Sequence, residues 1–220
     1  MKFSQLATAV AASIGSIAAV AAADLYTDAT FDTFDNGLDN LDISSVDVSD
    51  NGVDLTIAVS TRGFQTWTKY MLFFNTTGAG TSSNAWSRPV NVTSNIDYFI
   101  GSWVDAATSN SQLVSWTGAA WNWGSETVLT NSVAGNTVSW TFSLASMGLS
   151  AGQTLYFDVA TSGGGGTDPG VDHLSRSDLA TSGWGSASTS GNFLAYTTVP
   201  APSVMALLGL AGLAGRRRRG

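Results

Sequence analysis

The chain has few of the residues on which most enzymes and most nucleic-acid-binding proteins depend. Its 220 residues include no cysteine and a single histidine, and only one of its 16 acidic residues is a glutamate, Glu126. The absence of cysteine excludes a disulfide framework, a thiolate metal site and a thiol nucleophile. Basic residues number 9, and five of them lie at the two ends. Because phosphate contacts need clustered lysine and arginine, a nucleic-acid groove is excluded as well.

Residues 1–23 have the layout of a secretory signal peptide. Lys2 gives a positive start, residues 6–20 are apolar and rich in alanine, and three alanines ending at Ala23 precede Asp24. This order predicts a signal helix that is cleaved after Ala23. The alternative is an alanine-rich helix of the fold. Between Asp24 and residue 199, 4 basic residues stand against 16 acidic ones, a net charge of about −12.

Residues 199–220 predict a sorting tail. Pro200 and Pro202 precede an apolar run over residues 204–214, which is shorter than the ~20 residues of a comfortable membrane span. The chain then ends in a basic cluster of Arg216, Arg217, Arg218 and Arg219. Since arginines stay on the cytoplasmic side, we expect a short apolar helix that anchors the chain transiently in the inner membrane before processing.

This three-part tail resembles the PEP-CTERM sorting signal of Gram-negative bacteria. The family's motif is Pro-Glu-Pro, and Ala201 stands here in the place of the glutamate. The resemblance implies export, recognition by an exosortase-type membrane protease, and release to the cell surface or the extracellular matrix.

Residues 24–198 predict one all-β domain, because short alternating runs separated by turn residues replace any long helical period. The clearest hairpin joins residues 41–48 to residues 53–60 through a turn that contains Asn51-Gly52. Val53, Leu55 and the residues that alternate with them are expected on one face. One helical turn is expected over residues 143–149, capped by Gly148. Further strand-like runs cover residues 69–75, 97–104, 112–116, 127–130, 137–144, 155–160 and 192–198. The expected architecture is a single antiparallel β-sandwich of the jelly-roll or immunoglobulin-like kind.

The body of the chain also resembles the DOMON-like sandwiches related to family 9 carbohydrate-binding modules. The resemblance rests on the order of four segments: residues 41–59, residues 67–75, residues 84–90 followed by 97–100, and residues 151–159 followed by 170–174. It implies a sandwich that binds a ligand, often a sugar, without catalysis.

The eight tryptophans are the main candidates for ligand binding. Aromatic faces stack on pyranose rings, and binding residues concentrate in loops. Trp67, Trp86, Trp121 and Trp123 lie outside the strand-like runs. Trp103, Trp116 and Trp140 lie within such runs and are expected in the core. Core packing remains the alternative for the first four as well.

The N-terminal segment is the candidate metal site. Nine aspartates lie between residues 24 and 54 with no basic residue among them. Asp28, Asp32 and Asp35 offer oxygen ligands for a structural Ca²⁺, although the spacing is not that of an EF-hand. A solvated acidic face with turn caps is the alternative.

Catalytic chemistry is poorly represented. His173 neighbours Asp172 and Ser175, but no nucleophile-elbow motif is present, and a hydrogen-bonded loop histidine is the simpler interpretation. The sequence therefore predicts an exported, non-catalytic carbohydrate-binding sandwich with polysaccharide as its partner. The alternatives are a structural matrix protein associated with exopolysaccharide and, third, a small secreted hydrolase.

Overall fold

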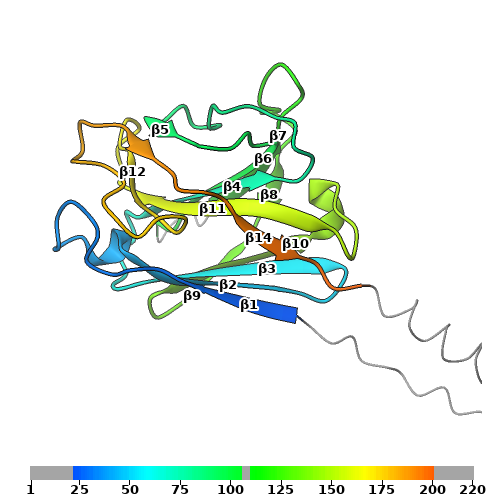
Figure 1. The fold of residues 1–220 in the computed structure, drawn as a ribbon, viewed down its shortest axis with the longest axis horizontal. Coiled ribbons are helices and arrows are strands. Elements are labelled where there is room, and N and C mark those ends of the chain that lie inside the picture. The colour runs from blue at the N-terminus through cyan, green and yellow to red at the C-terminus, as the bar shows by residue number, and fades with distance from the viewer. Residues whose placement is uncertain (1–21, 106–109, 201–220) are drawn as a thin grey trace, which may run out of the picture.

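The computed structural model describes residues 22–105 and 110–200, and these residues form an almost entirely β structure. Two sheets pack face to face in a sandwich-like arrangement, seen edge-on in Figure 1. Every strand pair within these two sheets is antiparallel. Across the described ranges, no helix is long and apolar enough to cross a membrane. Most of the expected signal helix and all of the apolar tail helix lie outside the described residues.

The first sheet has five strands in the order β1-β2-β3-β10-β9. Their bounds are Ala22–Thr27, Ile43–Asp50, Asp54–Thr61, Thr137–Ser143 and Asn131–Ala134. The β2–β3 hairpin confirms the strongest sequence prediction. Gly52 has φ +83° in its turn, and Asn51 Oδ1 accepts hydrogen bonds from the backbone N–H groups of Val53 and Asp54. Val53 lies in this turn rather than in the strand, so the expectation that it faces the core is wrong: its side chain is exposed.

The second sheet has seven strands in the order β12-β11-β4-β6-β7-β8, with β14 paired to β11. Their bounds are Gly170–His173, Thr154–Ser162, Lys69–Asn75, Tyr98–Trp103, Asn110–Ser115, Thr127–Leu129 and Leu194–Thr197. Two shorter strands, β5 (Val90–Asn91) and β13 (Ser188–Thr189), form a separate parallel pair. Two 3₁₀ turns complete the elements, η1 (Asp39–Leu41) and η2 (Leu144–Met147). Gly148 caps η2 in the left-handed conformation, as the sequence predicts.

The main core fills the space between the two sheets. Alternate residues point inward, as in Leu55 and Ile57 on β3 and Leu72 and Phe74 on β4, all with 0% exposure. Trp140 lies at the centre, and its indole N–H donates to the hydroxyls of two buried serines on β6 and β7. The prediction that Trp140 belongs to the core is therefore confirmed.

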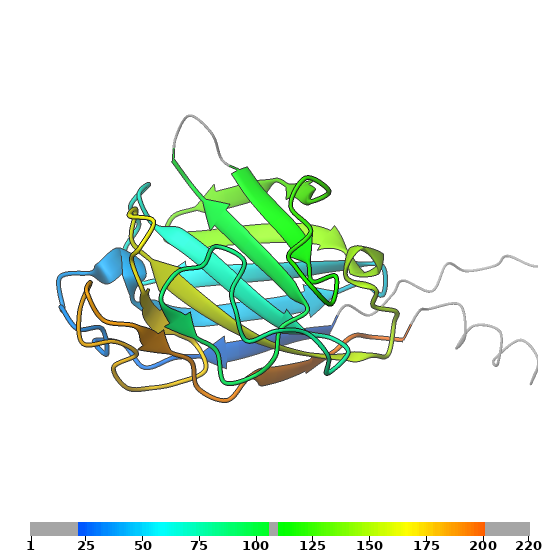
Figure 2. The same ribbon diagram turned by 90° about the horizontal axis from the view of Figure 1, so that it is seen from above.

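The second sheet is also buried on its outer face. Met71 and Phe73 alternate with the inward residues of β4 and join a second apolar cluster with Phe99. The chain between β4 and β6 crosses this face and covers it, as Figure 2 shows from above. Trp86 and Trp121 pack onto the cluster from this cover and from the loop after β7. A sheet buried on both faces explains why β4 reads as an unbroken apolar run rather than an alternating one.

A substitution at Gly101 on β6 can test how closely Trp86 packs against the second sheet. A Cβ atom at Gly101 would lie 2.2 Å from the Trp86 ring, so Gly101→Ala must displace the indole. Overpacking of this kind costs about 1–3 kcal/mol. We expect the melting temperature to fall by at least about 2 °C in thermal unfolding. Gly166→Ala is the control, because a Cβ atom there meets nothing within 4 Å. Equal melting temperatures for the two variants would contradict the close seating of Trp86.

Candidate metal centre

Three aspartates from distant parts of the chain meet at one end of the sandwich. Asp28 and Asp32 lie in the loop that follows β1, and Asp172 lies on β12 of the other sheet. One carboxylate oxygen from each lies within 4.8 Å of those from the other two. We call Asp28, Asp32 and Asp172 the acidic cluster. It joins the edges of the two sheets at this end.

Hydrogen bonds from the backbone fix two of the three carboxylates. Asp172 Oδ2 accepts from the N–H of Ile43 at 2.6 Å, and Oδ1 accepts from the N–H of His173 at 2.7 Å. Asp28 Oδ1 accepts from the N–H of Ala29. The start of β2 in the first sheet is thereby held against β12 in the second, which determines where Asp172 sits relative to the loop.

Several buried carboxylate oxygens in this region have no hydrogen-bond partner within the described residues. They are Asp28 Oδ2, both oxygens of Asp32, and Oδ1 of Asp42. Asp42 is 0% exposed, and its other oxygen accepts from Phe31 N–H and Arg62 Nη1. Buried carboxylate oxygens are costly unless they are paired, protonated or bound to a cation.

The raised pKa values of the acidic cluster also indicate that its carboxylates are costly to ionise without a cation. Burial and the neighbouring charge of Asp32 raise the pKa of Asp28 to about 8. Burial, followed by the charges of Asp28 and Asp32, raises the pKa of Asp172 well above its usual range. The pKa of Asp32 is raised by burial and by Asp42. Burial and neighbouring carboxylates thus oppose the ionisation of all three residues, so a cation placed among them would relieve both the burial and the repulsion.

One arginine partly balances the surrounding charge. Arg62 pairs with Asp42 at 2.7 Å and with Asp39 at 2.6 Å. Its guanidinium also lies 3.5 Å from the centre of the Phe31 ring, and Phe31 has the unusual φ of +68°. Arg62 thus holds the loop from the side of the first sheet, while the three oxygens of Asp28 and Asp32 stay unpartnered.

The spacing of the acidic cluster suits a calcium ion. Ca²⁺ takes oxygen ligands at about 2.3–2.6 Å, so two ligands on opposite sides of the ion are about 4.6–5.2 Å apart. The three aspartate oxygens all lie within 4.8 Å of one another, which is close enough for one such ion to contact all three. Carboxylates with free, buried oxygens are the donor type that Ca²⁺ prefers.

The structure brings two of the three predicted metal ligands together. Asp28 and Asp32 lie together, but Asp35 does not join them: its side chain is exposed and its Oδ1 accepts from the N–H of Gly37 in a turn. Sequence reasoning missed Asp172 and the adjacent Asp42. Asp172 is 129 residues from its partner Ile43, and no local spacing could connect it to the N-terminal loop.

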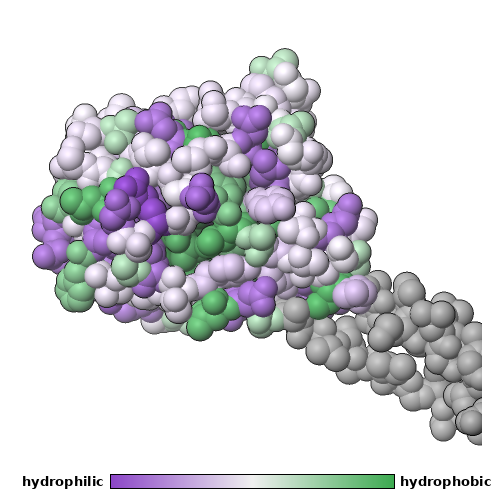
Figure 3. Space-filling model, viewed as in Figure 1, coloured by the Kyte–Doolittle hydropathy of each residue, from purple (hydrophilic) through white to green (hydrophobic). Residues whose placement is uncertain are grey.

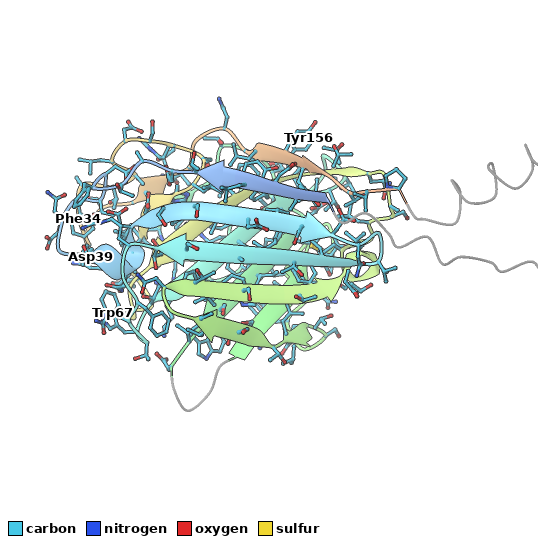
Figure 4. The ribbon with its side chains drawn as sticks, turned by 90° about the horizontal axis from the view of Figure 1, so that it is seen from below. Phe34, Asp39, Trp67 and Tyr156 are labelled. Atoms are coloured by element: carbon cyan, nitrogen blue, oxygen red, sulfur yellow. The ribbon has the colours of Figure 1, made fainter. Side chains whose placement is uncertain are left out.

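The four predicted sugar-binding tryptophans do not form one platform. Trp86 and Trp121 are half-buried in the outer cluster, each beside Phe99, at 5.5 and 6.2 Å between ring centres. Trp123 is 43% exposed in the loop after β7. Trp67 is 37% exposed and lies with Phe34 and Asp39 at the end of the sandwich that carries the acidic cluster, as Figure 4 shows.

Two other tryptophans differ from the sequence prediction. Trp103 and Trp116, which were expected in the core, are only half-buried. Trp184, which the sequence did not single out, is 41% exposed and packs edge-on against Phe34 at 5.2 Å. Figure 3 shows apolar and hydrophilic side chains next to one another on the surface at this end.

His173 takes part in a buried hydrogen-bonded chain rather than lying in a loop. Its Nδ1 lies 2.7 Å from Asp158 Oδ2, and its Nε2 lies 3.2 Å from Ser188 Oγ. All three residues are 0% exposed. A Cβ atom at Gly170 would lie only 2.4 Å from Nε2, so the space beside the histidine is already filled. The arrangement ties β11, β12 and β13 together and leaves no approach for a substrate.

The processing residues fall at the limits of the described chain. Ala23 lies in β1 with its side chain exposed, and Pro200 is the last described residue. Pro202, Arg216, Arg217, Arg218 and Arg219 lie outside the described residues.

None of the family models, curated proteins or solved structures compared with this chain matches it.

Proposed function

We propose that this chain is an exported, calcium-binding β-sandwich that binds carbohydrate at the cell surface or in the extracellular matrix and catalyses no reaction on it. The observation that carries the proposal is the acidic cluster, in which buried carboxylate oxygens converge without hydrogen-bond donors. A Ca²⁺ ion bound there is structural, because its ligands come from the N-terminal loop and from β12 and so join the two sheets.

The calcium part rests on geometry that a merely solvated acidic face does not need. Carboxylates on such a face point into water and repel one another weakly. Asp172 is 1% exposed and Asp42 is 0% exposed, so neither can be relieved by solvent. Arg62 is already engaged by Asp39 and Asp42. A divalent cation would balance the charge that these carboxylates carry when they are ionised.

The carbohydrate part rests on surface chemistry. Partly exposed tryptophan rings and many serine and threonine hydroxyls are the groups that bind pyranose faces and sugar hydroxyls. The strong negative charge of the exported part disfavours acidic polysaccharides, so a neutral polysaccharide is the better partner. The resemblance to DOMON-like sandwiches and family 9 carbohydrate-binding modules supports the same function, as does the expected jelly-roll or immunoglobulin-like class.

The absence of catalysis is supported by the burial of His173. The Asp158–His173–Ser188 chain has the order of a hydrolase triad, but a hydrolase nucleophile must reach its substrate. Ser188 is instead 0% exposed, and its Oγ accepts from the N–H of Gly170 at 3.1 Å as well as lying within hydrogen-bonding distance of His173. A structural role between β12 and β13 accounts for all of these contacts.

A second candidate is a matrix protein without a specific ligand. The half-buried positions of Trp86 and Trp121 favour it, because both rings stabilise the cover of the second sheet. Trp121 Nε1 also donates to the backbone oxygen of Ser83, which further anchors the ring. Under this alternative the sandwich packs with exopolysaccharide through its general polar surface.

The calcium proposal predicts that Asp32→Asn changes the melting temperature differently in chelator and in Ca²⁺. In chelator, Asp32→Asn should raise the melting temperature, because it removes a buried negative charge from the acidic cluster. With Ca²⁺ at about 100 times its dissociation constant, the wild type should gain about 2.7 kcal/mol, or about 5–11 °C, and Asp32→Asn should gain much less. Differential scanning calorimetry measures both.

Asp35→Asn is the matched control, because Asp35 belongs to the same loop but its exposed carboxylate lies outside the acidic cluster. It should respond to Ca²⁺ like the wild type. A wild-type melting temperature that is the same in chelator and in Ca²⁺ would leave the acidic cluster without a metal.

The binding proposal is tested by affinity electrophoresis of the exported protein in gels that contain soluble polysaccharides. We expect retardation by at least one of laminarin, hydroxyethylcellulose, galactomannan and soluble starch, and none by the acidic polysaccharide alginate. Mobility that is unchanged in all four neutral gels would favour the matrix protein without a specific ligand.

The proposed route to the surface is the sorting tail. The PEP-CTERM resemblance supports cleavage of the signal peptide after Ala23, transient anchoring, and removal of the tail near Pro200–Pro202 by an exosortase-type protease. Intact mass spectrometry of the released protein should show that the arginines 216–219 are absent. A released species that still carries Arg219 would contradict removal of the tail.

A further inference from the structure

The second sheet carries a groove of about 380 Å³ at one end of its central strands, and none of the lining residues belongs to the acidic cluster. It opens where β4 ends and β6 begins, on the opposite half of the sheet from β12. The turn after β4 contributes Thr77 and Ala79, the start of β6 contributes Asp97 and Tyr98, and the segment after β7 contributes Trp116 and Thr117. Its volume lies at the lower end of the range typical of small-ligand sites, about 300–1,000 Å³.

Asp97 fixes both walls of this groove. Its carboxylate accepts four hydrogen bonds at 2.8–3.0 Å, from the backbone N–H and the hydroxyl of Thr76 and of Thr77. Its backbone oxygen accepts from the N–H of Trp116 at 2.8 Å on the other wall. The two walls are therefore positioned before any ligand arrives, which reduces the entropy lost on binding.

The Trp116 ring is held in place from behind. It packs edge-on against Trp121 at 5.6 Å between ring centres. Trp121 is itself fixed, because its Nε1 donates to the backbone oxygen of Ser83 at 3.0 Å. Trp116 lines the groove while it remains half-buried, so part of a rigid aromatic surface is available to a ligand.

The polar groups of the groove match sugar hydroxyls. The hydroxyl of Thr77 donates to Asp97 and accepts from the N–H of Ala79 at 3.4 Å, which leaves one lone pair to accept from a ligand hydroxyl. Thr117 is exposed at the opposite wall; its hydroxyl donates to the backbone oxygen of Ala120 and accepts from the N–H of Ala120, so one lone pair remains there as well. The only charge that lines the groove is negative, because its charged lining residue is Asp97, so an anionic ligand is disfavoured.

We infer that this groove is the saccharide-binding site, with Trp116 as the platform for one ring of a neutral polysaccharide. The inference rests on the proposed carbohydrate-binding function and gives it a location that the sequence did not indicate. It replaces the dispersed set of Trp67, Trp86, Trp121 and Trp123 with one pre-shaped surface, in which Trp121 supports Trp116 from behind.

Two variants test the groove in the exported protein. Ala79→Leu fills the groove with a non-aromatic side chain and removes no contact of the fold, since Ala79 is exposed. Trp116→Ala removes the platform. The probes are laminarihexaose, cellohexaose, mannohexaose and maltohexaose, measured by isothermal titration calorimetry. Each variant should bind the preferred hexasaccharide at least about tenfold more weakly than the wild type.

Each variant has a matched control away from the groove. Ala134→Leu adds the same bulk at an exposed position on β9 of the first sheet, and Trp184→Ala removes a 41%-exposed ring at the end with the acidic cluster. Both should bind within about twofold of the wild type. Circular dichroism spectra and melting temperatures confirm that each variant is folded. Should Trp116→Ala unfold, Ala79→Leu alone decides the outcome.

The outcomes distinguish the carbohydrate-binding function from its location in the groove. A wild type that binds none of the hexasaccharides, and is retarded by none of the neutral polysaccharides, overturns both the carbohydrate function and the groove. A wild type that binds, together with an Ala79→Leu variant that binds equally well, overturns the groove and keeps the function. Selective loss in the two groove variants supports the groove.

Discussion

The fold depends on one constraint, which is that the second sheet carries large apolar side chains on both faces. One face is buried against the first sheet, and the other must be covered by chain that is not part of either sheet. Two segments therefore bury the outer face of this sheet: the chain between β4 and β6, and the loop after β7. Trp86 and Trp121 pack these segments against Phe99 of β6. The same requirement shapes the groove, because Asp97 and Trp116 lie where these two covering segments meet.

The end of the sandwich near β12 depends on a different balance. Carboxylates from the loop after β1, from the residue before β2 and from β12 converge there with Arg62 as a partial counterion. Burial that would be harmless for an apolar side chain raises the pKa values of Asp28, Asp32 and Asp172 here. Repulsion among these carboxylates therefore opposes folding at this end, while the apolar core between the sheets stabilises the rest of the molecule.

Local patterns predicted the strands well and the sites only in part. The strand at residues 69–75 and the Asn51-Gly52 hairpin could be predicted from the sequence. Their signals are an apolar run, alternation and turn residues, which all involve residues close together in the chain. Asp28 and Asp32 were identified by composition, but Asp172 reaches them only through the pairing of β12 with β11, which no local pattern specifies. The prediction that Trp116 lies in the core was wrong for a related reason. The strand-like run that contains Trp116 predicts a buried side chain. The groove beside it is formed by Asp97 and the turn after β4, which are distant in the sequence.

The residue at the far end of β2 has a mechanical consequence. Asp50 belongs to the first sheet, yet it accepts hydrogen bonds from Tyr196 Oη at 2.6 Å and from the N–H of Val199, just beyond β14 of the second sheet. The first described strand begins beside it, since Ala22 pairs with Asp50, and Figure 1 shows both ends of the described chain leaving from this side. Tension on a tether beyond Pro200 would be divided at Asp50 between the two sheets. Such a load would have to break the Asp50 contacts before it could pull β14 away from β11, so Asp50 would shield the pairing of these two strands from force applied at this end.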